Sequence, residues 1–233
     1  SRVRARIERV LDWAKARGLR EGENPAQWRG GLAHILPARK LVHQVRHHPA
    51  LEYKEAPAFL EQLRKRRGLG ARALEFAILT AVRTSEAREA SWGEIDLDEG
   101  VWTVPPARTK TGRENRVPLS SAAMEVLKPL KVARQSDVVF PGQKKGKPLS
   151  NNTLLVTLKN MGRRDVTVHG FRSTFRDWAA EQTDFAGEVA EAALAHTIKN
   201  KVEAAYRRGD LFDKRRQLFE AWAAYCTSAI KGV

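Results

Sequence analysis

The sequence predicts an α+β fold that is mainly helical and contains one small antiparallel sheet. Apolar residues recur at helical spacing through most of the chain, as is typical of amphipathic helices. Between Ile95 and Leu119 this spacing gives way to short alternating runs, which two turn-forming segments, Asp98–Gly100 and Lys110–Arg113, separate. Apolar residues make up 42% and charged residues 30% of the 233-residue chain, a composition typical of a folded globular protein.

The first 48 residues are predicted to form a unit distinct from residues 49–233. Apolar residues at helical spacing predict an amphipathic helix over residues 3–17, and a turn-rich stretch follows at 24–32. The chain opens with Ser1 in the middle of this helical pattern, so we interpret it as a piece of a longer protein.

A basic segment from Pro37 to Pro49 is predicted to link the two units. It contains six cationic or titratable side chains: Arg39, Lys40, His43, Arg46, His47 and His48. Histidines at this density could bind a metal ion, but neither a cysteine nor a carboxylate ligand lies nearby. The net charge of +15 for the whole chain indicates a polyanionic partner, so we favour a linker that contacts DNA.

The larger unit is predicted to alternate helices with the sheet in a fixed order. Helices are expected over residues 56–66, 71–82, 121–130, 151–161, 170–181, 185–195, 201–208 and 211–228, and strands over residues 95–97, 101–104 and 116–119. The helix over 71–82 is mostly apolar, which predicts that it is buried. Thr167 is placed to cap the helix that starts near Gly170.

The charge of the chain indicates a nucleic-acid partner. The 42 Lys and Arg residues against 27 Asp and Glu give a net charge of +15. Cationic side chains release the counterions that are condensed on phosphate, so such an excess favours binding to nucleic acid over other functions of basic proteins. The single cysteine, Cys226, excludes an internal disulfide and a cysteine-based zinc site. No stretch reaches the roughly 18 apolar residues of a membrane span, and no signal peptide is recognisable.

Two pairs of polar residues are candidates for binding a phosphate. His169 and Arg172 are three positions apart at a predicted helix start, where both face the positive end of the helix. An ordinary helix cap with a surface arginine would give the same pattern. Arg83 follows a long apolar run, with Glu86 placed to orient it, although a cation at this point could also simply answer the helix dipole.

Three further residues are ambiguous when taken singly. Lys110 is predicted at the tip of a hairpin, where exposed basic residues are common. His196 precedes a turn, and Tyr206 follows ten residues later at a spacing that also suits a core residue. The ordered set of Arg, Lys, His-x-x-Arg, His and Tyr is far more specific than any of its members.

This ordered set resembles that of the tyrosine recombinases, specifically the integrases of phages and genomic islands. The similar stretches are residues 81–92, 108–113 with 117–120, 169–175, and 194–206 with 215–223. The resemblance spans roughly residues 51–226 and implies the integrase catalytic-core fold for 49–233. Residues 1–48 resemble only the end of the family's core-binding domain and its linker.

The resemblance implies a transesterification at a DNA phosphodiester without metal or ATP. Tyr206 would be the nucleophile that forms a 3′-phosphotyrosyl bond, and Arg83 and Arg172 would clamp the non-bridging oxygens. Lys110 would protonate the leaving 5′ oxygen as general acid. The remaining roles are a proton shuttle for His169, a hydrogen bond to phosphate for His196 and a supporting contact for Glu86. We see no carboxylates at metal-site spacing and no Gly-rich nucleotide loop.

Partners and further DNA contacts also follow from the resemblance. We expect double-stranded attachment-site DNA, a homo-oligomer that is a tetramer on DNA, DNA-bending and excision factors, no membrane, and a nucleoid-associated place in the bacterial cytoplasm. Additional DNA contacts are expected from Arg113, Arg176, Arg207 and Arg208, with a glutamate partner or plain solvation as alternatives for some of them. The apolar last helix either docks on a neighbouring protomer or packs within its own chain. A topoisomerase of type IB, a catalytically inactive DNA-binding relative and an RNA-binding protein are alternative functions.

Overall fold

The computed structural model describes residues 2–37, 49–196 and 209–228 of the chain. The chain forms two compact units, Ser1–His47 and His48–Val233. No helix in the described segments is both long enough and apolar enough to cross a lipid bilayer.

The smaller unit consists of helix α1 (Arg2–Ala16) and a turn-rich segment that folds back on it. The Asn24 side-chain amide joins the two, because it donates to the Glu8 carbonyl at 2.9 Å and to the Asp12 carboxylate at 2.6 Å. Arg4 strengthens this contact through the carbonyl of Ala26 at 2.6 Å. The predicted helix is therefore present, and polar contacts hold the turns against it.

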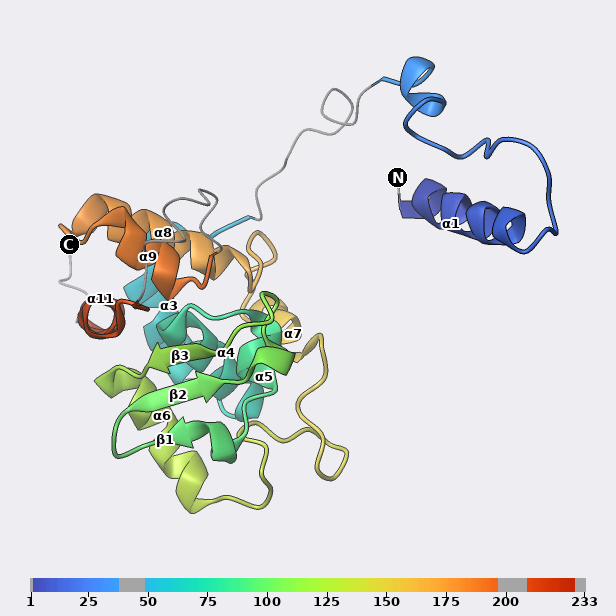
Figure 1. Ribbon diagram of the computed structural model, residues 1–233. Helices are drawn as coiled ribbons and strands as arrows, with labels where there is room; N and C mark the ends of the chain where they lie inside the picture. The colour runs from blue at the N-terminus through green and yellow to red at the C-terminus, as the bar shows by residue number, and fades with distance from the viewer. Residues whose placement is uncertain (1, 38–48, 197–208, 229–233) are drawn as a thin grey trace. The chain divides into compact units, whose positions relative to one another are not determined.

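Helix α4 (Leu69–Thr80) forms the centre of the larger unit (Figure 1). Nine of its twelve residues are buried, as its apolar sequence predicts. Helices α3, α6, α7 and α11 pack around it. The other helices are α3 (Ala56–Arg64), α5 (Thr84–Arg88), α6 (Ser121–Val132), α7 (Thr153–Asn160), α8 (Gly170–Gln182), α9 (Gly187–Ala193) and α11 (Phe212–Thr227).

A three-stranded antiparallel sheet covers one side of these helices, in the order β1 (Ile95–Asp96), β2 (Val101–Val104), β3 (Asn115–Pro118). Trp102 on the middle strand pairs with Ile95 and Val117, and its side chain is completely buried. Phe76 of α4 packs on its ring at 5.2 Å between centroids. The predicted mainly helical fold with a small antiparallel sheet is thus confirmed.

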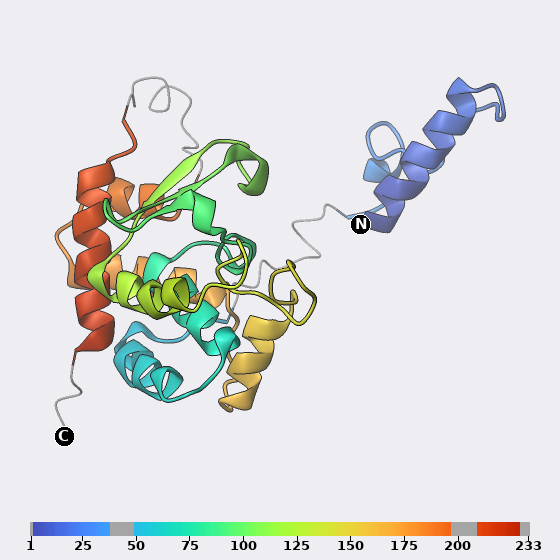
Figure 2. The same ribbon diagram turned by 90° about the horizontal axis from the view of Figure 1, so that it is seen from below.

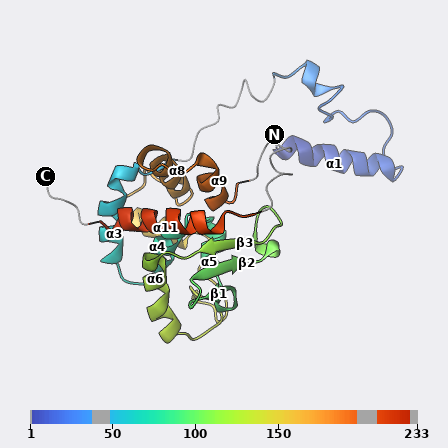
Figure 3. The ribbon, with the colours of Figure 1, turned by 60° about the vertical axis from the view of Figure 1, so that its left-hand side comes forward.

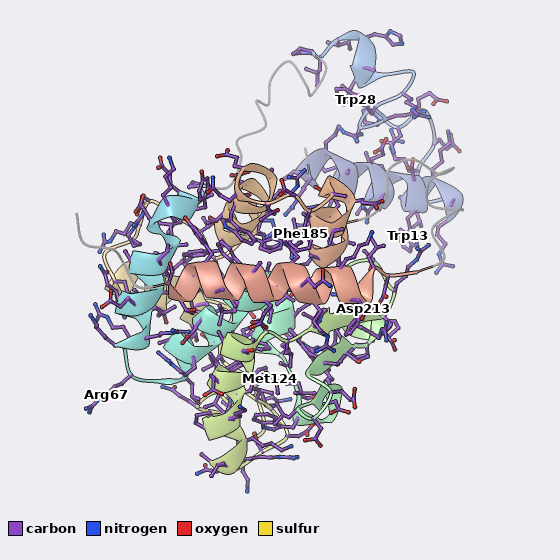
Figure 4. The ribbon with its side chains drawn as sticks, turned by 90° about the vertical axis from the view of Figure 1, so that its left-hand side faces the viewer. Trp13, Trp28, Arg67, Met124, Phe185 and Asp213 are labelled. Atoms are coloured by element: carbon purple, nitrogen blue, oxygen red, sulfur yellow. The ribbon has the colours of Figure 1, made fainter. Side chains whose placement is uncertain are left out.

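The last described helix, α11, packs inside its own chain. It runs along the unit with α8 and α9 on one side and with α6 and the sheet on the other (Figures 2 and 3). Trp222 is completely buried, and its indole N–H donates to the Ile78 carbonyl of α4 at 2.9 Å. Phe175 of α8 stacks on Phe219 at 5.5 Å. Asp213 marks its exposed first turn in Figure 4. In this single chain the helix packs on its own unit, and docking on a neighbouring protomer stays an alternative prediction.

Several local features differ from the sequence expectation, mostly at the ends of helices and strands. Helix α5 was not expected, because five residues are too few to give a periodic pattern. Helix α4 ends at Thr80 and not at Val82, because Ala81 adopts the left-handed conformation with φ 46°. Helix α9 is shorter at both ends than the predicted 185–195. The helix expected over residues 201–208 lies outside the described residues.

Candidate active site

Arg172 is a buried cation that joins the ends of two helices. It lies in the first turn of α8, and only 5% of its surface is exposed. One terminal nitrogen, Nη1, donates to the Ala81 carbonyl just after α4, and Nη2 donates to the Leu194 carbonyl just after α9, both at 2.5 Å. Burial and the nearby positive charge of Arg83 lower the pKa of Arg172 to about 10, so the side chain remains cationic at neutral pH.

Arg83 is held at the start of α5 by Glu86. The Arg83 backbone N–H donates to Glu86 Oε2 at 3.0 Å, and its Nη1 donates to Glu86 Oε1 at 2.9 Å. Only 2% of the Glu86 surface is exposed, so its carboxylate both caps α5 and orients the guanidinium. Arg83 Nη2 reaches the Ala195 carbonyl at 3.2 Å. Sequence reasoning anticipated that Glu86 orients Arg83, and the geometry agrees with it.

The two arginines converge on the two consecutive residues that follow α9. Arg172 donates to Leu194 and Arg83 to Ala195, although the two cations are 89 positions apart in the printed sequence. Two of the residues whose carbonyls accept these bonds, Ala81 and Ala195, are left-handed, with φ of 46° and 48°. A non-glycine residue in this region costs about 1–2 kcal/mol, and such strain clusters at functional sites. Arg83 and Arg172 therefore lie close together, as two cations that bind one phosphate must.

His196 belongs to the same cluster through Glu191. Its Nδ1 lies 2.7 Å from Glu191 Oε2, and the other oxygen of this carboxylate accepts from Arg176 Nε at 2.7 Å. Burial alone would raise the pKa of Glu191, but the hydrogen bonds from Arg176 and His196 outweigh it and lower the pKa. Arg176 therefore has the glutamate partner that was one of the two alternatives for it, and Glu191 is a member of the cluster that sequence reasoning missed.

His169 occupies the N-cap position of α8, and its side chain is exposed. Its carbonyl accepts the Arg172 backbone N–H at 3.1 Å, so the two candidates lie one turn apart on the same helix start. The N-cap is therefore His169 and not Thr167 as expected, although the Thr167 hydroxyl does accept the Gly170 N–H of the first turn at 3.0 Å.

Lys110 lies on the loop between β2 and β3, and its side chain is exposed, as is that of Arg113. The loop starts with the 3₁₀ turn Pro106–Arg108 and is closed by the Thr109 hydroxyl, which donates to the Arg113 carbonyl at 2.7 Å. Tyr206, the nucleophile that the resemblance implies, lies outside the described residues, as do Arg207 and Arg208.

The residues that the structure describes contain no group of three or more His, Cys, Asp or Glu side chains that could hold a metal ion. The histidines of the linker at 43, 47 and 48 lie outside these residues. The cluster consists of guanidinium groups that carboxylates and backbone carbonyls orient, an arrangement whose chemistry suits the binding of an anion.

Comparison with known sequences decides the family. A family described as the phage integrase family matches residues 49–210, well over half of the chain. The chain belongs to the phage integrase family. Residues 1–31 match a second family, described as the phage integrase central domain.

Individual members of the phage integrase family are similar at moderate identity. The chain is 39% identical to prophage integrase IntA of Escherichia coli (strain K12) over 160 residues, which cover 66% of this chain and 38% of that protein. It is 32% identical to the integrase of Enterobacteria phage P4 over 244 aligned positions, which cover 96% of this chain and 54% of that protein. The chain therefore spans only about a third to a half of these relatives.

Solved structures show that the fold is that of an integrase. A lambda integrase (75–356) dimer bound to a COC′ core site superposes with a TM-score of 0.59 at 20% identity, covering 84% of this chain and 71% of that chain. The integrase from mycobacterium phage Brujita gives a TM-score of 0.56 at 18% identity, covering 97% and 76%. The integrase catalytic-core fold expected from the sequence is confirmed.

Proposed function

We propose that this chain carries the catalytic domain of a tyrosine site-specific recombinase, which cuts and rejoins DNA through a phosphotyrosyl intermediate at Tyr206. The convergence of Arg83 and Arg172 on residues 194–195 is the observation that carries the proposal. Two forked guanidinium groups on rigid helix starts can bind the two non-bridging oxygens of one phosphodiester.

The reaction proceeds by in-line displacement at phosphorus. The Tyr206 phenol oxygen attacks, a bond forms between this oxygen and phosphorus, and the bond to the 5′ oxygen breaks. His169 takes the phenol proton and Lys110 gives a proton to the leaving 5′ oxygen. Arg83, Arg172 and His196 stabilise the charge that accumulates on the non-bridging oxygens. The attack of the freed 5′ hydroxyl of a second strand reverses these steps and reseals the DNA.

The substrate that we propose is double-stranded DNA at an attachment site of a mobile element in a bacterial nucleoid. Solved structures with this fold include a lambda integrase dimer bound to a core site and a tetramer bound to a Holliday junction. We therefore propose a homo-oligomer, a tetramer during strand exchange, with DNA-bending and excision factors as further partners of the full-length protein. Arg113, Arg207 and Arg208 are proposed as contacts to the DNA backbone, and Arg176 as a contact that acts beside its ion pair with Glu191.

A nicked suicide substrate tests this function. Cleavage next to the nick releases a short fragment that carries the freed 5′ hydroxyl, and once this fragment diffuses away the covalent complex cannot reseal. Wild-type protein is expected to form a denaturant-resistant adduct with DNA, and Tyr206→Phe is expected to form none, because it lacks the nucleophilic oxygen. Denaturing gel electrophoresis measures the adduct. An adduct that persists in Tyr206→Phe contradicts the assignment of the nucleophile, and relaxation of supercoiled DNA without strand exchange favours the topoisomerase alternative.

Glu191 is expected to fix the tautomer of His196. An ionised carboxylate can only accept, so the bond at 2.7 Å requires a proton on Nδ1. In the neutral ring Nε2 is then an acceptor, so His196 donates to the phosphate from Nε2 only when the ring carries both protons. In Glu191→Gln the ¹⁵N spectrum of the His196 ring is expected to show both tautomers at neutral pH. Adduct formation is expected to slow by up to about fivefold, since a partly exposed ion pair contributes up to about 1 kcal/mol.

The matched control for Glu191→Gln is Asp177→Asn, which neutralises an exposed carboxylate on α8. Its ring spectrum and its rate should equal those of the wild type. An Nδ1-protonated ring that is unchanged in Glu191→Gln would mean that some other group sets the tautomer.

A further inference from the structure

Arg108 forms a two-point clamp at the foot of the loop that carries Lys110. Its Nη1 is bonded to the Glu94 carboxylate, and its Nη2 donates to the backbone carbonyl of Glu86 at 2.6 Å. The Arg108 and Glu94 side chains are only 18% and 13% exposed. Glu94 is itself fixed by the buried Trp102, whose indole N–H donates to it at 2.9 Å. The foot of the loop is thus tied to the sheet and to α5 together.

Glu86 connects this clamp to the proposed phosphate site. Its carboxylate holds Arg83, and its backbone carbonyl holds Arg108. The first turn of α5 therefore fixes both the guanidinium of Arg83 and the loop that carries Lys110. Beyond the foot, Thr109 closes the loop onto Arg113 at 2.7 Å, so Lys110 sits on a short ring of backbone and not on a free chain.

We propose that Arg108 is a positioning residue, which places Lys110 at the leaving 5′ oxygen by clamping the loop to α5. This inference rests on the proposed function. Lysine has a long flexible side chain, and a general acid must come within about 2.6–3.2 Å of the atom that it protonates. Fixing the backbone on both sides of Lys110 relative to Arg83 reduces the positions that the ammonium can sample. Arg108 itself touches neither the phosphate nor the leaving group in this scheme.

The proton that Lys110 gives to the leaving 5′ oxygen allows a selective test of this role. When the bond between phosphorus and the 5′ oxygen breaks, the electron pair goes to that oxygen, which takes the proton from the Lys110 ammonium. If sulfur replaces this bridging oxygen, the leaving group departs as a stable thiolate and needs no proton. A defect that acts only through Lys110 therefore disappears with the sulfur substrate, whereas a defect in phosphate binding or in folding remains.

The experiment compares initial rates of adduct formation on suicide substrates with a bridging 5′ oxygen or a bridging 5′ sulfur. In Arg108→Met the rate on the oxygen substrate is expected to fall about 10- to 100-fold, because a misplacement of about 1 Å can cost a hundredfold. The rate on the sulfur substrate is expected to stay within about threefold of the wild type. Lys110→Met is expected to show the same pattern with a larger loss, and Arg172→Met is expected to be slow on both substrates.

Arg108→Lys is a milder variant, which tests the role of Arg108 even if Arg108→Met does not fold. Its ammonium can face Glu94 but lacks the fork that also spans to the Glu86 carbonyl, so a smaller loss with the same rescue by sulfur is expected. Arg134→Met, which removes an exposed arginine paired with Asp137 at 3.2 Å, is the matched control and should leave both rates unchanged.

Two results would overturn the inference. One is an equal loss on both substrates in Arg108→Met and Arg108→Lys, and the other is no loss on the oxygen substrate in either variant. A wild-type protein that forms no adduct on either substrate would instead overturn the proposed function, and the inference with it. An active wild type without the selective pattern refutes only the role of Arg108.

Discussion

Replacing Arg172 with methionine is expected to slow adduct formation by about a hundred- to a thousand-fold, the typical cost of losing one donor that stabilises a transition-state charge. The guanidinium is already oriented before DNA binds, because Ala81 and Leu194 accept from its two Nη groups. Its Nε is buried and has no hydrogen-bond partner among the described residues. Single-turnover rates at saturating DNA measure the effect, and Arg172→Lys should recover little of the loss, because an ammonium lacks the forked geometry.

The same substitution is expected to leave the domain folded, which separates the effect from unfolding. Methionine removes a cation whose burial opposes folding, as its pKa lowered to about 10 indicates. It also leaves the carbonyls of Ala81 and Leu194 without their donor, at a cost of about 1–3 kcal/mol for each buried group. These changes oppose one another, so a thermal midpoint within a few degrees of the wild type is expected.

Arg88→Met is the matched control for Arg172→Met. Arg88 is also largely buried and also donates to a backbone carbonyl, that of Leu149 at 2.7 Å, but it lies outside the cluster of Arg83, Arg172 and His196. It should lose stability without a comparable loss of rate. A rate within tenfold of the wild type in Arg172→Met would contradict the role of Arg172 as a phosphate clamp.

The longer helices, the strands and the contact between Arg83 and Glu86 were predictable from the sequence, because each depends on residues that are close together along the chain. The spacing of apolar residues located every longer helix that the structure describes, and the alternation around Trp102 located the sheet. The contact of Glu86 with Arg83 was also predictable, because a carboxylate three positions after an arginine is close enough to pair with it. Helix α5 itself was missed, because five residues hold less than two turns of pattern.

The assembled site depends on backbone features that leave no trace in periodicity. Arg172 and Arg83 meet through the carbonyls of residues 81, 194 and 195, at the points where left-handed Ala81 and Ala195 end their helices. Alanine is the strongest helix former, so its sequence pattern predicts continuation and not a left-handed turn. The bond between Glu191 and His196 depends on the same turn, which explains why sequence reasoning found the histidine and missed the glutamate.

Binding to double-stranded DNA is expected to weaken by about 10³- to 10⁵-fold between 50 and 200 mM salt, if the full protein neutralises roughly six to ten phosphates. The net charge of +15 supplies the cations for such an interface. Each phosphate contact adds about −0.9 to the slope of log affinity against log salt concentration, because it releases condensed counterions. Fluorescence anisotropy with a labelled duplex measures this slope, and a flat response would argue against an interface that follows the phosphate backbone.

Substitutions at two arginines test whether the salt dependence comes from specific phosphate contacts or from the net charge alone. Arg113 is exposed on the loop that carries Lys110, whereas Arg176 is paired with Glu191 at 2.7 Å. Both substitutions to glutamine remove one formal charge, so a diffuse charge effect would lower the slope equally. We expect Arg113→Gln to make the negative slope shallower by about 0.9. Arg176→Gln should change the slope by less, because a cation that already has a carboxylate partner releases fewer counterions when DNA binds. A larger change for Arg176→Gln than for Arg113→Gln would mean that DNA displaces Glu191 from Arg176, and that the loop at Arg113 lies away from the backbone.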